Sequence, residues 1–169
     1  MSITAIVYKS NTGFTREYAQ MLGKSAKLKV YALDQARDLA EQAEIIYMGP
    51  LMAGHITGVD QAVKRYAVRA VCGVGMTAPG EKALASLGRS NYVPNAPIFY
   101  LQGGYAPKKL SWLKRRMVNM ATKSTRENLL GKQKRTAQEQ AQLDMLLKGG
   151  SFVAYRNLEP IQSWLAQQP

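Results

Sequence analysis

Cysteine and histidine are almost absent from this chain of 169 residues, which contains one of each. One Cys excludes a disulfide within the chain, and Cys72 with His55 provides too few ligands for a zinc site. Long apolar runs are also lacking, since none approaches the roughly 18 residues that a membrane-spanning helix requires. The first residues show no basic segment followed by an apolar one, so we expect no secretory signal peptide. These absences predict a single domain over residues 1–169, with a cytoplasmic localisation.

Acidic residues are scarce as well. The chain has 11 Asp and Glu against 23 Lys and Arg, and its formal net charge is +12. The excess is concentrated in one segment that has ten basic residues and a single acidic one, Glu127. Its basic residues are Lys108, Lys109, Lys114, Arg115, Arg116, Lys123, Arg126, Lys132, Lys134 and Arg135. The rest of the chain therefore has nearly equal numbers of basic and acidic residues, and one segment is strongly cationic.

Apolar runs of strand length alternate with segments of helical period along most of the chain. Runs that are apolar on both faces are typical of a parallel sheet covered by helices on both sides. The pattern predicts an α/β fold with a doubly wound five-stranded parallel sheet in the order 2-1-3-4-5. The expected strands are 3–8, 28–33, 44–48, 70–76 and 98–102; the expected helices are 14–23, ending at Gly23, then 37–42, 59–67, 81–87 and a last one capped by Asn157.

Residues 105–151 break this alternation, between the fifth strand and the last helix. Leu110, Leu113, Met117 and Met120 have helical spacing. A second helix, rich in Gln and Ala, is expected at 136–147. We interpret the segment as a helical insertion within the single domain.

The loop after the first strand has the strongest indication of function. In an open parallel sheet, ligands bind beyond the carboxyl ends of the strands, where the strand order reverses. Three loops meet there: 9–15, 49–58 and 77–80. The first combines hydroxyls at Ser10, Thr12 and Thr15 with Gly13 at the start of a helix, a combination that can hold a phosphomonoester. The alternative is that Asn11 and Thr12 merely cap the helix.

The sequence of residues 10–15, Ser-Asn-Thr-Gly-Phe-Thr, matches the phosphate loop of the flavodoxin family at each of its fixed positions. The order of strands and helices is similar too. The chain resembles more narrowly the flavodoxin-domain group that includes the bacterial menaquinone-dependent protoporphyrinogen oxidase. This narrower resemblance rests on residues 49–55, on Gly103-Gly104 before the basic helix, and on Gly149-Gly150 before the last helix.

The resemblance implies an FMN cofactor, with its phosphate on residues 10–15 and its ring between the 49–55 and 77–80 loops. No catalytic residue and no metal ligand is assigned, because the flavin carries the redox chemistry. Neither ring loop contains the aromatic residue that flavodoxins usually stack on the flavin, although Tyr105 could enter from the loop after the fifth strand. The residues implied to bind the cofactor are Ser10, Asn11, Thr12, Gly13, Phe14, Thr15, Pro50, Leu51, Met52, Ala53, Gly54, Thr77, Ala78, Pro79 and Gly80.

The cationic segment 108–135 allows several interpretations. It can be a helix packed on the sheet edge with a solvated positive face. It can contact an anionic membrane peripherally at the inner face, through Trp112, Leu113 and Met117, or steer an acidic redox partner. Nucleic acid ranks last, because no recognised binding motif accompanies the charge.

Two functions follow from these residues and from the resemblance. The first, implied by the resemblance, is an FMN-binding electron-transfer protein or oxidoreductase, with a redox partner protein or a quinone as its partner; its narrower form is a quinone-linked dehydrogenase that resembles protoporphyrinogen oxidase. The alternative is a flavodoxin-fold binding or regulatory module without flavin, which uses the basic segment to bind an acidic partner or a membrane surface. His55, which lies in a ring loop, is a candidate proton donor or an ordinary loop residue, and Cys72 is expected to be buried in a strand.

Overall fold

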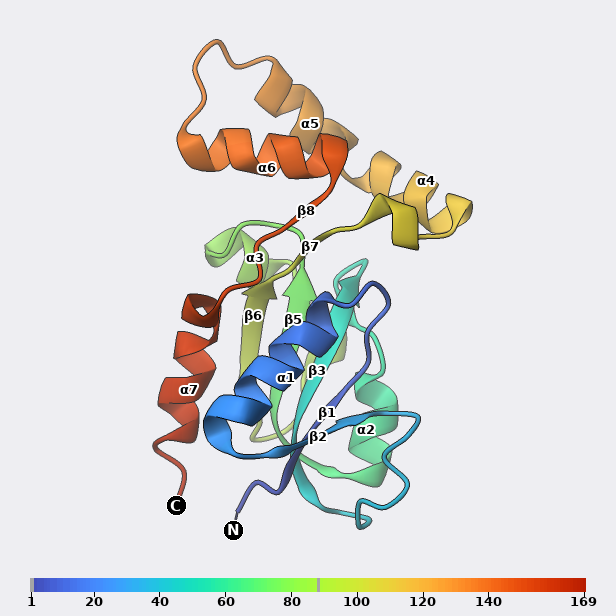
Figure 1. Ribbon diagram of the computed structural model, residues 1–169, viewed down its shortest axis with the longest axis vertical. Coiled ribbons are helices and arrows are strands. Elements are labelled where there is room, and N and C mark those ends of the chain that lie inside the picture. The colour runs from blue at the N-terminus through green and yellow to red at the C-terminus, as the bar shows by residue number, and fades with distance from the viewer. Residues whose placement is uncertain (1, 88) are drawn as a thin grey trace.

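The computed structural model describes residues 2–87 and 89–169, which form a parallel sheet with helices on both faces and a helical insertion at one end (Figure 1). The five parallel strands lie in the order β2-β1-β3-β5-β6, which confirms the predicted fold. Three of the four residues of β1 are buried, as expected of a central strand. The strands are β1 (Ala5–Tyr8), β2 (Lys29–Ala32), β3 (Glu44–Met52), β5 (Ala67–Gly75) and β6 (Ile98–Gln102).

Helices cover the two faces of the sheet and bury one apolar cluster on each side. On one face, α1 (Phe14–Ala26) and α7 (Glu159–Leu165) pack on a cluster that includes Ile6, Ile46 and Cys72. On the other, α2 (Val59–Arg65) packs on Val7, Ile45 and Val71, while the short α3 (Glu81–Ala85) contacts β6. A 3-10 turn, η1 (Arg89–Asn91), follows α3.

The third strand is longer than predicted. It continues past Met48 and turns back into β4 (His55–Ile56), which pairs with it in an antiparallel hairpin. Ala53 and Gly54 form the turn with φ of 50° and 78°, and positive φ at both positions is what a two-residue hairpin turn of type I′ requires. The sequence Gly49-Pro50 suggested an end of the strand. However, Pro50 remains in the strand: it pairs in register with Val74 of β5, and its carbonyl accepts from the Thr57 N–H at 2.9 Å across the hairpin.

Several predicted helix boundaries are wrong for tertiary reasons. Gly23 lies inside α1, where a Cβ would come within 2.3 Å of Val30 on the adjacent strand; α1 ends instead at Ala26, before Lys27 in the left-handed conformation. The predicted helix 37–42 is a series of turns, and the Gln42 N–H bonds the Arg65 carbonyl 2.8 Å away. The predicted helix 81–87 ends two residues early, at Ala85.

The ends of two further elements also differ from prediction. α2 stops at Arg65, and β5 begins at Ala67, because the Tyr66 ring is buried and its hydroxyl donates to the Ala36 carbonyl at 2.9 Å. Asn157 does not cap the last helix. Its amide donates to the Tyr18 hydroxyl at 2.6 Å and to the Phe152 carbonyl at 2.8 Å, and a 3-10 turn, η3 (Tyr155–Leu158), precedes α7.

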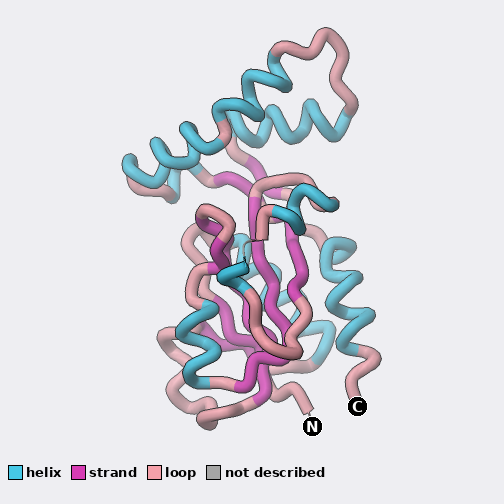
Figure 2. The backbone as a smooth tube through the Cα atoms, turned by 180° about the vertical axis from the view of Figure 1, so that it is seen from behind, coloured by secondary structure: helices cyan, strands magenta, loops and turns pink. Residues whose placement is uncertain are grey.

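The insertion leaves and re-enters the body through a short two-stranded stalk formed by β7 (Gly104–Tyr105) and β8 (Gly150–Ser151). Its helices stand beyond the carboxyl ends of the sheet strands (Figure 1) and remain clear of the sheet when seen from behind (Figure 2). Both predicted helices are present, and a third lies between them. The insertion contains η2 (Pro107–Lys109), α4 (Trp112–Ala121), α5 (Lys123–Leu130) and α6 (Ala137–Lys148).

Side chains of α6 tie the insertion to the sheet. Gln142 donates to the Met76 carbonyl at 3.0 Å and accepts from Gln102 at 3.1 Å, so it links the ends of β5 and β6 to the insertion. Thr136 and Glu139 form a reciprocal capping box at the start of α6. No helix within residues 2–87 and 89–169 has the length and apolar character needed to cross a membrane.

Candidate functional site

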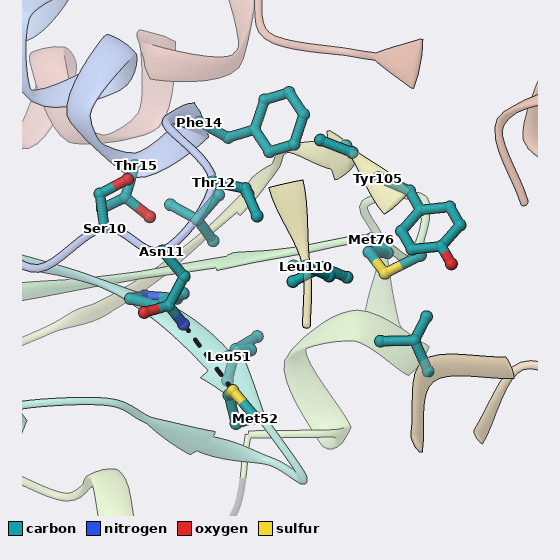
Figure 3. Close-up of a pocket in the computed structure, with 16 residues that line it drawn as sticks. Ser10, Asn11, Thr12, Phe14, Thr15, Leu51, Met52, Met76, Tyr105 and Leu110 are labelled. Carbon is teal, nitrogen blue, oxygen red and sulfur yellow. Dashed lines mark hydrogen bonds between the residues drawn. The ribbon is translucent and has the colours of Figure 1, made fainter. Parts of the chain in front are cut away.

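A cavity opens at the carboxyl ends of β1, β3 and β5, beneath the start of the insertion (Figure 3). Hydroxyl groups from the loop after β1 line one end. Apolar side chains from β3, from the end of β5 and from the insertion line the other. The lining residues are Ser10, Asn11, Thr12, Phe14, Thr15, Pro50, Leu51, Met52, Val74, Gly75, Met76, Gly104, Tyr105, Ala106, Leu110 and Val118.

The polar end is the start of α1, which has no side-chain cap. Gly13 occupies the N-cap position with φ of 103°, a left-handed conformation that glycine adopts without strain. The Ser10 hydroxyl accepts a hydrogen bond from the Gly13 N–H at 3.1 Å, whereas neither Asn11 nor Thr12 caps the helix. The alternative in which these two residues only cap α1 therefore does not describe the structure.

Several donors at this helix start have no partner within the part of the chain that the structure describes. They are the backbone N–H groups of Phe14, Thr15 and Arg16 and the hydroxyls of Thr12 and Thr15. No fully enclosed side-chain N or O atom among the described residues lacks a hydrogen bond, so the two hydroxyls open onto the cavity. Unpaired N–H groups at a helix start and nearby hydroxyls are suited to an anion.

A cation from the insertion makes the electrostatic potential at this helix start more positive. The Lys109 ammonium group donates to the Thr12 carbonyl at 3.3 Å, so the insertion reaches across to the loop after β1. Arg115 supports this arrangement, because its guanidinium donates to the Pro107 carbonyl at 3.2 Å and to the Leu110 carbonyl at 3.5 Å. The polar end of the cavity therefore fits a phosphomonoester dianion in charge and in donor type.

The other end is apolar. Met52 approaches from β3 and Met76 from the residue after β5, and Leu110 lies between Met52 and the neighbouring Met76 and Tyr105 (Figure 3). The Asn11 amide contacts the Met52 sulfur at 3.8 Å and so joins the two predicted loops. Two aromatic rings border the cavity, those of Phe14 and Tyr105, although the loops at 49–55 and 77–80 contain none. The cavity therefore has one polar end beside a cation and one apolar end, the two surroundings that the phosphate and the ring of FMN would each need.

The structure brings together only some of the predicted cofactor residues. Residues 10–12, 14, 15 and 50–52 line the cavity, and Gly13 is part of the same loop. Ala53 and Gly54 form the hairpin turn beside it. Thr77 and Ala78 line a different cavity, beneath α5 and α6, and Pro79 and Gly80 line neither.

Sequence reasoning missed the contributions of the insertion and of one buried amide. Leu110 and Val118 reach the cavity only because the stalk positions α4 above the sheet, and no local pattern signals that contact. Asn91 is fully buried; its side chain accepts from the Ile56 N–H at 2.7 Å and donates to the Gly54 carbonyl at 2.6 Å. It therefore holds the β3–β4 hairpin. A buried Asn in a loop of this kind has no periodicity that would reveal it.

The single His and the single Cys lie outside the cavity lining. The His55 ring contacts Asp60 at 3.1 Å and the Ser90 hydroxyl at 3.2 Å. Cys72 is buried, and burial raises the pKa of its thiol, which makes it a poor nucleophile. Within the described residues, no cluster of three His, Cys, Asp or Glu side chains could hold a metal ion.

One of three comparisons with known proteins identifies a family for this chain. A family model described as a flavodoxin domain matches residues 5–129, from β1 to the end of α5. Searches of curated proteins and of solved structures each found no match. The matched segment is well over half of the chain and contains all five parallel strands and the loop after β1. The chain therefore belongs to the flavodoxin domain family.

Proposed function

We propose that the chain binds FMN in this cavity and acts as an electron-transfer protein or oxidoreductase. The observation that carries the proposal is the uncapped start of α1. Thr12, Phe14 and Thr15 line the cavity there, and the two hydroxyls and the first N–H groups of the helix have no hydrogen-bond partner among the described residues. When bound, FMN supplies one- and two-electron redox chemistry. The protein binds the phosphate, orients the ring against Met52 and Met76, and limits the access of water.

The finer form of this proposal is a quinone-linked dehydrogenase that resembles protoporphyrinogen oxidase. It is supported by the cationic insertion, which flavodoxins acting only as small electron carriers do not need, and by its position over the cavity. Oxidation of a porphyrinogen by the FMN-loaded protein, followed by electron transfer to a soluble naphthoquinone, is the expected activity. Reduction of the loaded protein by an iron–sulfur protein alone would favour the simple electron carrier.

A second candidate is a binding module that does not use flavin. Leu110 and Val118 favour it, because these side chains from the insertion border the space that a ring would enter. The two candidates differ in whether FMN binds with its phosphate on residues 10–15. Removal of the hydroxyls from that loop therefore distinguishes them.

The test is the double variant Thr12→Val and Thr15→Val, which keeps side-chain volume and removes both hydroxyls. Hydrogen bonds to a charged group contribute about 1.5–3 kcal/mol each, so we expect FMN affinity to fall on the order of 100-fold or more. Folding, followed by circular dichroism, should be retained. Thr12→Ser with Thr15→Ser is the matched control, and it should bind FMN nearly as tightly as the natural chain. Equal affinities of the valine and serine variants would contradict the assignment of the phosphate loop.

A further inference from the structure

The outer face of α4 exposes large apolar side chains to solvent. Trp112 is 72% exposed, Leu113 54%, Met117 52% and Met120 71%, and no residue of α4 is buried. At 100° per residue these four side chains occupy one side of the helix. Arg116 lies on the same side, between Trp112 and Met120. A cluster of exposed apolar side chains around a cation indicates an interaction surface.

The opposite side of the same helix already has partners. Val118 lines the cavity, and the Asn119 side chain accepts from the Tyr105 hydroxyl at 3.5 Å. Arg115 is engaged with backbone carbonyls before the helix. α4 therefore does not pack on the sheet edge, as one interpretation of the sequence had it. The side of α4 that faces the cavity has contacts within the protein, and the outer side is exposed.

The charges around this patch are uniformly positive. Lys114 and Arg116 are exposed on α4, and neither forms an ion pair with an acid among the described residues. The ion pairs of the insertion join Lys123 to Glu127 and Lys132 to Glu139, both beyond α4. Lys114 lies at the border of the patch and Arg116 within it, so the surface that fits must offer apolar and anionic groups side by side.

We propose that the outer face of α4 binds the surface of an anionic lipid bilayer. Such a surface meets both requirements at once: Trp, Leu and Met enter the interface while Lys and Arg remain at the phosphates. A second copy of the chain would bring like charges together, because each copy has a net charge of +12. Nucleic acid would neutralise the cations and leave the apolar side chains in water.

This binding mode places the cavity close to the lipid, because α4 and the segment before it line the cavity with Val118 and Leu110. It does not depend on FMN. The protein without FMN and the protein loaded with FMN are both expected to bind, so failure of flavin binding and failure of membrane binding are separate results.

The test is co-sedimentation of the full chain with large vesicles of phosphatidylcholine alone or with about one-third phosphatidylglycerol. We expect binding to the anionic vesicles and little to the neutral ones. Lys114→Gln with Arg116→Gln should weaken binding by about 30-fold, since each cation near the surface contributes about 1 kcal/mol. The matched control is Lys24→Gln with Lys29→Gln, which removes two exposed cations from the body and should retain most of the binding.

The apolar part of the proposal has a separate readout. The chain has two Trp residues, and Trp164 packs beside Phe99 with ring centroids 6.1 Å apart. In the variant Trp164→Phe, Trp112 is the only Trp; its fluorescence should shift to the blue on addition of anionic vesicles and be quenched by brominated lipid. Trp112→Ser with Met120→Ser should reduce sedimentation at least as much as the charge variant. Equal sedimentation of all variants, absence of a Trp112 shift, or equal binding to neutral vesicles would overturn the proposal, as would binding only to RNA or to an acidic protein.

Discussion

The sheet with its covering helices and the insertion at residues 105–151 differ in how they place their apolar side chains. In the body, Ile46, Leu22 and Ile161 are fully buried in a cluster shared by strands and helices. In the insertion, no residue of α4 is fully buried and only Val118 packs against the small cluster there, while α5 and α6 bury a few side chains between themselves and the stalk. The body is therefore stabilised by its own core, whereas α4 leaves apolar and cationic side chains exposed to solvent.

The largest effect expected from this difference concerns stability. Ile46→Ala should lower the free energy of unfolding by about 2–5 kcal/mol, because it leaves a cavity between the sheet and its helices. Met120→Ala on α4 removes a side chain of similar size that is 71% exposed, and should change stability by no more than about 0.5 kcal/mol. Urea unfolding of both variants measures the contrast. Similar losses would show that α4 is packed in solution.

The stalk between the two regions is the next most sensitive point. A Cβ on Gly104 would lie 2.2 Å from the Gly150 carbonyl oxygen across the stalk, with no space for it. Gly104→Ala should therefore cost about 1–3 kcal/mol and expose the insertion to proteolysis. Gly131→Ala, at the end of α5, is the matched control, since its nearest contact would be at 3.4 Å. Cleavage of the insertion at equal rates in both variants would contradict a tight stalk.

Alkaline pH should lower the stability of the body. Burial raises the pKa of Tyr100 to about 12, and its hydroxyl donates to the Thr77 carbonyl at 2.6 Å. The stabilisation that comes from this raised pKa is fully present below about pH 10, the pKa of Tyr in the unfolded chain. It is lost between about pH 10 and 12, because the unfolded chain releases the proton before the folded chain does. Tyr100→Phe should make this loss shallower in urea unfolding measured at each pH. Tyr92→Phe, at a side chain that is 73% exposed, should leave the pH profile unchanged.

Acid pH should lower the local stability of the insertion, and this is the smallest of the four expected effects. The hydrogen bond from Lys132, and a second one from the Thr136 N–H, lower the pKa of Glu139. The start of α6 is thus stabilised above the ordinary pKa of Glu and loses this stabilisation as the pH falls through the lowered value. The protection factors for hydrogen exchange in the first turn of α6, which correct for the intrinsic pH dependence of exchange, should fall below about pH 4.5, and less so in Glu139→Gln. Glu127→Gln, which removes an exposed ion pair, should show the natural profile.

The strands and the loop after β1 could be predicted because their signals are local. Residues 98–102 are apolar on both faces and form β6 with the predicted bounds. The carboxyl ends of parallel strands converge, so Thr12 and Leu51 could be expected near one another from the order of strands alone. The structure brings them to one cavity.

Other features depend on contacts between distant segments. The glycine pairs at 103–104 and 149–150 were visible in the sequence, but their close approach across the stalk was not. The contact of Leu110 with the cavity follows from that stalk. Gly23, read from the sequence as the end of a helix, is instead the point where α1 passes close to Val30. In each case the local sequence pattern predicts one role for a residue, and a contact with a distant segment gives it another.

FMN binding by the natural chain tests the central claim most directly. The protein is purified, its visible absorption spectrum is recorded, and FMN is titrated into the flavin-free form while flavin fluorescence is followed. We predict a flavin absorption band in the purified protein or saturable quenching with one FMN per chain, and no comparable binding of riboflavin, which lacks the phosphate. If FMN neither co-purifies nor quenches, or if riboflavin binds equally well, the phosphate loop and the redox function are contradicted.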